Sequence, residues 1–256
     1  MQSRLYRQIL GIRFFTGTAE QSVEQMKSKG GLVVVPAAPA LINLPTQSAY
    51  REALVDADLA ITDSALMVLL WNLLHRDKIR RTSGLEYLSK LLNDPEARFP
   101  GNTFWIMPNP DSASRNLSWL RSQGILVPDS HVYMAPMYQG DIDDPKLLAQ
   151  LRELRPKHII VAVGGGTQER LGMYMKHALD YRPAIHCIGA AIAFLSGDQV
   201  RIPVWADRNG LGWLLRCISD PRRYVPRYWS ARKLVGLMLR YRDRMPETAT
   251  DPAKAA

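Results

Sequence analysis

A glycine turn between an apolar run and a helical pattern constrains this chain more than any other feature. Residues 158–170 read His-Ile-Ile-Val-Ala-Val-Gly-Gly-Gly-Thr-Gln-Glu-Arg. The run 159–163 predicts a strand buried on both faces, and 167–178 has helical spacing. Such a turn presents bare backbone N–H groups at the positive end of a helix dipole, which suits a phosphate or a diphosphate. The alternative is a tight turn that binds nothing, and this segment alone does not separate the two.

Strand and helix patterns alternate along most of the chain. Alternation of this kind predicts an α/β fold, here a Rossmann-like, mostly parallel sheet flanked by helices. The predicted strands are 32–35, 59–61, 103–107, 131–134, 159–163 and 184–188. The predicted helices are 47–57, 65–74, 84–92, 111–123, 145–154 and 167–178.

Length and cysteine content set further bounds. The 256 residues suit one α/β domain, alone or with an appendage. Cys187 and Cys217 form no disulfide framework and fit a reducing compartment, and no His/Cys cluster indicates zinc. The N-terminus has no signal-peptide pattern, and the longest apolar stretch, 65–74, is shorter than the ~20 residues of a membrane span. We therefore expect a cytoplasmic chain that does not cross a membrane.

The net charge of +9 is concentrated near the C-terminus. Between Arg216 and Arg244 there are nine basic residues and only two acidic ones. This segment is also rich in Trp and Tyr and has no strand pattern. We predict a catalytic domain over 1–199, a basic, helical, membrane-associating appendage over 200–245, and a disordered tail over 246–256.

One helix of the predicted appendage is amphipathic. Leu234, Leu237, Met238 and Tyr241 fall on one helical face with basic residues around them. Such a helix suits an anionic membrane surface. The alternative is a helix packed on the core with a solvated basic face. No nucleic-acid motif accompanies the charge, so nucleic acid is not an expected partner.

Two residues outside the glycine turn carry chemistry that would suit a site. Asp63 follows the strand 59–61, where α/β proteins bind ligands, and could be a general base. Its alternative role is the N-cap of the next helix. Arg81 precedes another glycine and helix and could bind a diphosphate with its planar fork, although a lone arginine is more often a surface charge. Glu169 is explained by its favourable place at a helix N-terminus.

Several segments taken together resemble the WecG/TagA/CpsF glycosyltransferases, also called glycosyltransferase family 26. The resemblance extends from Gly11 to about Arg227. It rests on the order and spacing of Ala57-Asp58-Leu-Ala-Ile-Thr-Asp63, Arg81-x-x-Gly84-x-Glu86, Gly164-Gly-Gly-Thr-Gln168-Glu169, Gly189…Ser196-Gly197…Arg201-Ile-Pro203, Gly210-Leu-Gly-Trp-Leu-Leu-Arg216 and Asp220-Pro-Arg-Arg223. The block from Trp213 to Arg223 is the most specific of these.

The resemblance implies an inverting glycosyltransferase of surface-polysaccharide or exopolysaccharide assembly. It would move a sugar from a UDP-sugar to a polyprenyl-diphosphate-linked sugar, peripherally on the inner face of the plasma membrane. Asp63 would be the general base and Arg81 a donor-pocket residue. The other implied substrate contacts are Gly164, Gly165, Gly166, Thr167, Gln168, Gly189, Arg216, Arg222 and Arg223. The three arginines would stabilise the leaving diphosphate in place of a metal, so no cofactor is expected. A homo-oligomer is left open.

The sequence departs from the family pattern where a sugar would be held. Val35 and Ala37 stand where the family usually has Thr and Asn, and Ser64 stands where it has Gly after the aspartate. An N-acetylmannosamine-type donor is therefore not assumed, and a hexose donor is a rival. The loss also motivates an alternative function, a catalytically degenerate relative that binds the lipid-linked intermediate or scaffolds an assembly complex.

Overall fold

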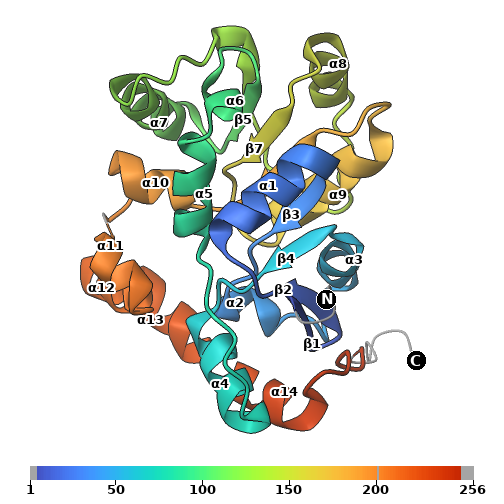
Figure 1. The fold of residues 1–256 in the computed structure, drawn as a ribbon, viewed down its shortest axis with the longest axis vertical. Coiled ribbons are helices and arrows are strands. Elements are labelled where there is room, and N and C mark those ends of the chain that lie inside the picture. Colours follow the sequence, from blue (N-terminus) through green and yellow to red (C-terminus); the bar gives the residue numbers. More distant parts are fainter. Residues whose placement is uncertain (1–4, 201, 249–256) are drawn as a thin grey trace.

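The protein is built on one mixed sheet with helices on both faces (Figure 1). The computed structural model describes residues 5–200 and 202–248, and within them eight strands pair in the order β1-β2-β4-β3-β8-β7-β5-β6. All neighbours are parallel except the β1–β2 pair. The strands are β1 Tyr6–Ile9, β2 Ile12–Phe15, β3 Gly31–Val34, β4 Leu59–Ile61, β5 Thr103–Met107, β6 Val132–Met134, β7 His158–Val161 and β8 Ala184–Cys187. The α/β prediction is confirmed.

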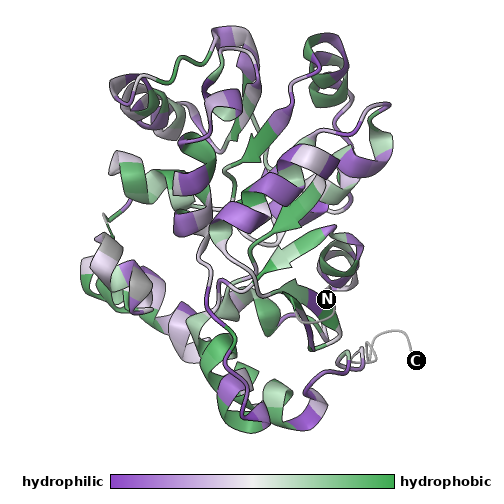
Figure 2. Ribbon diagram, viewed as in Figure 1, coloured by the Kyte–Doolittle hydropathy of each residue, from purple (hydrophilic) through white to green (hydrophobic). Residues whose placement is uncertain are grey.

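The central strands are apolar because both of their faces are covered. Every residue of β3, β7 and β8 is buried, as an internal parallel strand requires. In Figure 2 the central strands are hydrophobic, whereas the surrounding helices carry both hydrophobic and hydrophilic residues. Each of the six predicted strands is present, with ends shifted by no more than two residues.

Two apolar clusters, one on each face of the sheet, hold the helices. One face carries α2 (Ala38–Leu41), α3 (Ser48–Asp56), α4 (Ala65–His75), α8 (Pro145–Leu154), α9 (Thr167–Ala178) and α14 (Lys233–Tyr241). The other carries α1 (Ala19–Lys29), α5 (Gly84–Leu92), α6 (Pro95–Arg98), α7 (Pro110–Ser122) and α10 (Ala191–Ser196). The six predicted helices all form. Sequence patterns missed the short α2, α6 and α10, and α1, whose buried face interrupts a polar sequence.

The N-terminal hairpin was also missed. Its strands β1 and β2 are four residues each, and polar side chains interrupt them. The two-residue turn is Leu10-Gly11, with φ of 50° and 76°. Turns with two positive φ values usually carry Asn-Gly or Asp-Gly, so Leu-Gly gave no signal.

Helices make up most of residues 204–241, and the last of these helices belongs to the core. The helices are α11 (Val204–Arg208), α12 (Gly212–Ser219), α13 (Pro221–Ser230) and α14. On α14, Leu234 and Met238 are fully buried in the same cluster as the sheet. The apolar face of α14, which was predicted to bind a membrane, is therefore part of the hydrophobic core, because α14 packs against α4. Division of the chain near residue 199 stays a prediction.

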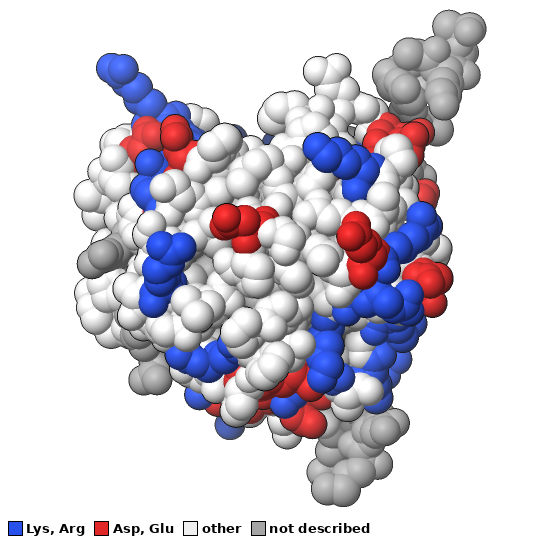
Figure 3. Space-filling view, turned by 90° about the horizontal axis from the view of Figure 1, so that it is seen from above, with Lys and Arg blue, Asp and Glu red and all other residues white. Residues whose placement is uncertain are grey.

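The C-terminal tail and the surface bear on two further expectations. Pro246 is buried and its carbonyl accepts a hydrogen bond from Arg51, while 249–256 of the predicted tail lie outside the described residues. The described part of the chain contains no helix long and apolar enough to span a bilayer. Viewed from above, acidic and basic side chains lie among one another around an uncharged area, so this end is not a basic face (Figure 3).

Gly172 explains how closely α9 approaches the sheet. A Cβ at this position would lie 2.5 Å from Leu32 Cδ1 and 2.7 Å from Cys187 Sγ, and both of these side chains are fully buried. In contrast, a Cβ at Gly236, inside α14, would meet nothing within 4 Å. The same substitution should therefore act oppositely at the two glycines.

We expect Gly172→Ala to lower the free energy of unfolding by about 1–3 kcal/mol through overpacking. Gly236→Ala should raise it by about 0.5–1 kcal/mol because alanine reduces the entropy lost in a helix. Urea titration followed by circular dichroism measures both. Equal effects at the two positions would show that close packing does not constrain Gly172.

Candidate functional site

The predicted site residues lie at one edge of the sheet, where the parallel strands end. Asp63 follows β4 and Val35 follows β3, while Gly189 and Gly164 follow β8 and β7. The connection after β3 enters the helices of one face, and the connection after β8 enters α10 on the other. Adjacent strands whose connections diverge in this way leave a crevice at their carboxyl ends, the usual ligand site of an open α/β sheet.

Asp63 is bound to the start of a different helix from the one that follows it. Ser64 caps α4, so the N-cap alternative for Asp63 is wrong. Instead, Asp63 Oδ1 accepts a 3.0 Å hydrogen bond from the backbone N–H of Gly84, at the start of α5. Its side chain is 22 % exposed, and Oδ2 has no hydrogen-bond partner among the described residues. The Gly84 bond therefore orients the carboxylate and leaves Oδ2 available to accept a proton.

Arg81 lies beside Asp63 and is held by an acid that sequence reasoning missed. Its Nε donates to the Asp63 carbonyl at 2.7 Å, and its Nη2 lies 3.6 Å from Asp63 Oδ1. Nη2 also pairs with Asp207 Oδ1 at 3.0 Å. Asp207, on α11, accepts a further 2.5 Å hydrogen bond from Ser83 Oγ. No motif marked Asp207, because its partners are more than 120 positions away.

The glycine turn is open on the side where a ligand would approach. Gly164 and Gly165 are exposed, and a Cβ on any of the three glycines would meet nothing within 4 Å. Only Gly166, with φ of 92°, needs glycine for its backbone conformation. Packing therefore does not explain the first two glycines, whereas close approach of a ligand to the backbone would.

Gln168 and Glu169 fasten the turn to the next strand. Gln168 Oε1 accepts a 2.6 Å hydrogen bond from the Gly189 N–H, and Nε2 donates to Glu169 Oε1 at 3.0 Å. Glu169 Oε2 accepts a 2.6 Å bond from the Gly166 N–H. Both side chains are almost fully buried, and burial raises the pKa of Glu169. Both polar atoms of the Gln168 amide are therefore hydrogen-bonded within the protein, and the amide does not point into open space.

The start of α5 joins these two halves of the site. A Cβ on Gly84 would lie 3.4 Å from Val35 Cγ2 and 3.5 Å from the Ile188 carbonyl oxygen. Asp63, Gly84, Gly189 and the glycine turn are therefore contiguous. Val35 is buried at this point and provides an apolar wall where a polar side chain was expected from the family pattern.

The three C-terminal arginines are placed differently from one another. Arg216 lies on α12, with its guanidinium 4.2 Å from the Phe194 ring centre and Nη1 donating to Tyr228 Oη at 2.9 Å. Arg222 and Arg223 are exposed in the first turn of α13. In the described chain they make no ion pair. Two cations at a helix N-terminus are unfavourably placed, and a bound anion would offset this.

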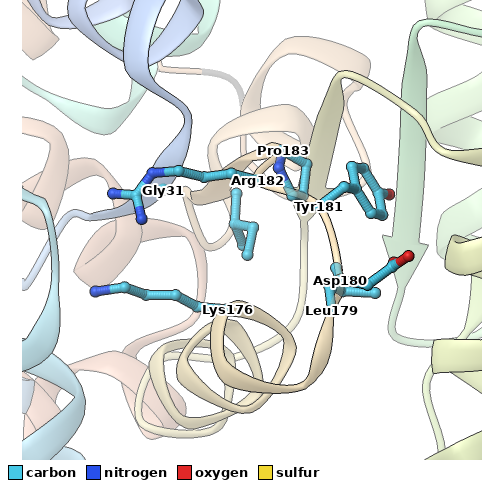
Figure 4. Close-up of a pocket in the computed structure, with 8 residues that line it drawn as sticks. Gly31, Lys176, Leu179, Asp180, Tyr181, Arg182 and Pro183 are labelled. Carbon is cyan, nitrogen blue, oxygen red and sulfur yellow. The ribbon is translucent and has the colours of Figure 1, made fainter.

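Two measurable cavities lie at the opposite, amino edge of the sheet. They enclose about 310 Å³ and 240 Å³ and share Tyr181, Arg182 and Pro183. In Figure 4 the Lys176 and Arg182 side chains extend to the same side, and both pair with Asp58, at 3.2 and 2.6 Å. The Asp56-Ala-Asp58 sequence therefore serves ion pairs far from Asp63. The basic side chains that line these cavities are already paired with acids. The carboxyl edge of the sheet therefore fits the predicted binding of a diphosphate better.

Comparison with known proteins supports the predicted relationship. The model described as "Glycosyl transferase WecG/TagA/CpsF family" matches residues 7–248, nearly the whole chain. No curated protein matches the chain.

The Asp207 ion pair should stabilise the protein measurably. We expect Asp207→Asn to lower the free energy of unfolding by about 1–3 kcal/mol, because Arg81 and Ser83 lose a charged acceptor. Asp180→Asn is the control. Asp180 and its partner Arg155 are 62 % and 50 % exposed, against 12 % and 20 % for Asp207 and Arg81, so the control should cost much less. Chemical denaturation compares the two, and equal losses would contradict a special role for Asp207.

Proposed function

The chain belongs to the WecG/TagA/CpsF family of glycosyltransferases, and we propose that it transfers a sugar from a UDP-sugar to a polyprenyl-diphosphate-linked sugar. The family makes it an enzyme of the transferase class. The finer proposal rests mainly on one observation, the half-free carboxylate of Asp63 beside an open glycine turn. The turn suits a diphosphate, and the carboxylate suits the proton of an acceptor hydroxyl.

The proposed reaction is a single displacement with inversion. Asp63 Oδ2 takes the proton of the acceptor hydroxyl while that oxygen bonds to the anomeric carbon. The bond from this carbon to the diphosphate oxygen breaks, and its electrons leave with UDP. Arginines stabilise the charge that develops on the diphosphate. We assign this role first to Arg216, because it stacks on Phe194, which packs in one buried cluster with Leu85 at the start of α5. Metal independence remains part of the proposal.

The donor sugar is constrained by what the site lacks. Val35 is apolar and buried at the end of β3, and Ala37 offers no hydrogen bond. A site without these polar partners gives up the discrimination that hydrogen bonds to an acetamido group would provide. We therefore favour a hexose donor. The same observation supports the rival function, a family member that binds the lipid-linked intermediate without transfer.

We expect UDP release when the protein is given a panel of UDP-sugars with a polyprenyl-diphosphate-linked sugar. Asp63→Asn should lower turnover about 10²- to 10⁴-fold, because asparagine keeps the acceptor for the Gly84 N–H but loses the base. Asp111→Asn, an exposed acid in the first turn of α7, is the control and should keep wild-type turnover. Wild-type rates in the Asp63 variant would remove it as the base, and binding without release from any donor would favour the rival function.

The membrane proposal rests on exposed aromatic residues beside the basic segment. Trp205 is 60 % exposed on α11 and Trp229 is 67 % exposed on α13. Ile218 on α12 and Val225 on α13 are also exposed. Exposed tryptophans among arginines are typical of surfaces that contact anionic lipid. With the face of α14 buried in the core, α11–α13 are the segment that we propose meets the membrane.

We expect the protein to bind vesicles that contain phosphatidylglycerol and to bind neutral vesicles weakly, with affinity falling as salt increases. Replacing Trp205 and Trp229 by Ser should weaken binding about tenfold or more, because apolar area is worth about 25 cal/mol per Å². The control replaces Phe99 and Met137, which are 66 % and 91 % exposed in other parts of the chain. Flotation assays measure the difference, and equal loss in both variants would contradict a localised membrane surface.

A further inference from the structure

We propose that Tyr228 is a positioning residue of the site: its hydroxyl and ring hold the Arg216 guanidinium in place for an anionic ligand. This inference deepens the proposed function and rests on it. It assigns a role to Tyr228, a residue that no motif marked, on the same helix as Arg222 and Arg223.

Arg216 is a cation whose surroundings leave it incompletely satisfied. Its Nε is buried and has no hydrogen-bond partner, and the only side-chain hydrogen bond of Arg216 in the described chain joins Nη1 to Tyr228 Oη. No carboxylate lies within ion-pair distance of it among the described residues. A buried N–H and a charge without a counterion are both costly. A phosphate group would supply the missing counterion, because a guanidinium donates hydrogen bonds to such groups.

Tyr228 has a fixed position and an unused hydrogen. Its ring centre lies 6.2 Å from that of Trp213 and 6.5 Å from that of Tyr224, which limits the movement of the ring. Its oxygen accepts from Arg216, whereas its own O–H finds no acceptor in the described residues. This hydrogen can donate to the same ligand oxygens that Arg216 would bind.

Electrostatics connect Tyr228 to the proposed base. Burial raises the pKa of the Tyr228 hydroxyl, and the negative charge of Asp63 raises it further, against the opposing effects of Arg216 and Arg227. The hydroxyl therefore stays protonated at neutral pH and keeps its hydrogen to donate. Packing places Tyr228 and Asp63 near each other: Arg216 stacks on Phe194, and Phe194 lies in one buried cluster with Leu85. Leu85 follows the Gly84 that binds Asp63, so Tyr228 and Arg216 lie near the part of α5 that holds the proposed base.

The chemistry explains why such a residue would matter. As the sugar leaves the diphosphate, negative charge grows on oxygens that Arg216 is placed to contact. A flexible arginine would lose side-chain entropy on reaching that geometry, whereas one already held by Tyr228 and Phe194 loses less. Removing the hydroxyl should therefore weaken stabilisation of the departing diphosphate without disturbing the core.

The experiment compares Tyr228→Phe with Tyr224→Phe. Tyr224 is on the same helix, but its hydroxyl bonds to Gln199, at 3.2 Å. Two quantities are measured for each variant, the affinity for UDP by calorimetry and the kcat and KM for UDP release. We expect Tyr228→Phe to weaken UDP binding and lower kcat by about 10- to 100-fold, with a smaller change in KM for the acceptor. Tyr224→Phe should match the wild type.

A double-mutant cycle with Arg216→Gln separates positioning from a merely structural role. If Tyr228 acts through Arg216, its removal should cost less than threefold once Arg216 is gone. Full additivity, or a Tyr228→Phe variant that behaves like Tyr224→Phe, would overturn the inference. If the wild-type chain binds UDP but releases none from any donor, the proposed transfer fails and the binding ratio still decides the role of Tyr228. A wild-type chain that binds no UDP overturns both proposals.

Discussion

The parallel pairing of β3, β8 and β7 is the constraint on which the rest of the molecule depends. Three strands buried on both faces can satisfy their N–H and C=O groups only by pairing with one another. Their common direction brings every following loop to one edge of the sheet. The strand ends after β4, β3, β8 and β7 are therefore neighbours, although 100 residues separate Asp63 from the glycine turn.

Loops gathered in this way need polar contacts to hold their shape, because they have little apolar surface to bury. The chain uses backbone N–H groups for this purpose. Gly84 donates to Asp63, Gly189 donates to Gln168, and Gly166 donates to Glu169. The first two of these bonds join the start of a helix or the end of a strand to a side chain from another element, and the third caps α9 locally. Asp207 extends the same principle to α11 and so connects the C-terminal helices to Asp63 through Arg81.

The strand and helix patterns could be read from the sequence because burial imposes them locally. The apolar run from Ile159 to Val163 can be recognised as a buried strand without knowing where the helices lie. The three glycines that follow show where this strand ends. The partners of Asp63, Arg81 and Gln168 could not be read, since each depends on which strands become neighbours. Asp63 looked like a helix cap from its position, and only the fold shows it bonded to α5. Similarly, a helix that packs on a core and a helix that lies on a membrane have the same spacing of apolar residues. Leu234 and Met238 fit both, and only the packing of α14 against α4 shows that this face belongs to the core.

The arginines near the carboxyl edge of the sheet differ in whether they have an acidic partner. Arg81 is neutralised by Asp207 and approaches Asp63, whereas Arg216, Arg222 and Arg223 have no acid of their own among the described residues. The Nε of the partly buried Arg216 has no partner, and two arginines at the N-terminus of α13 oppose the helix dipole. A bound anion would offset the unfavourable free energy of these unpaired positive charges. In the proposed reaction the positive charge would come from the C-terminal helices and the base from the end of β4, so the two would have to be held together for a diphosphate to leave as a hydroxyl attacks.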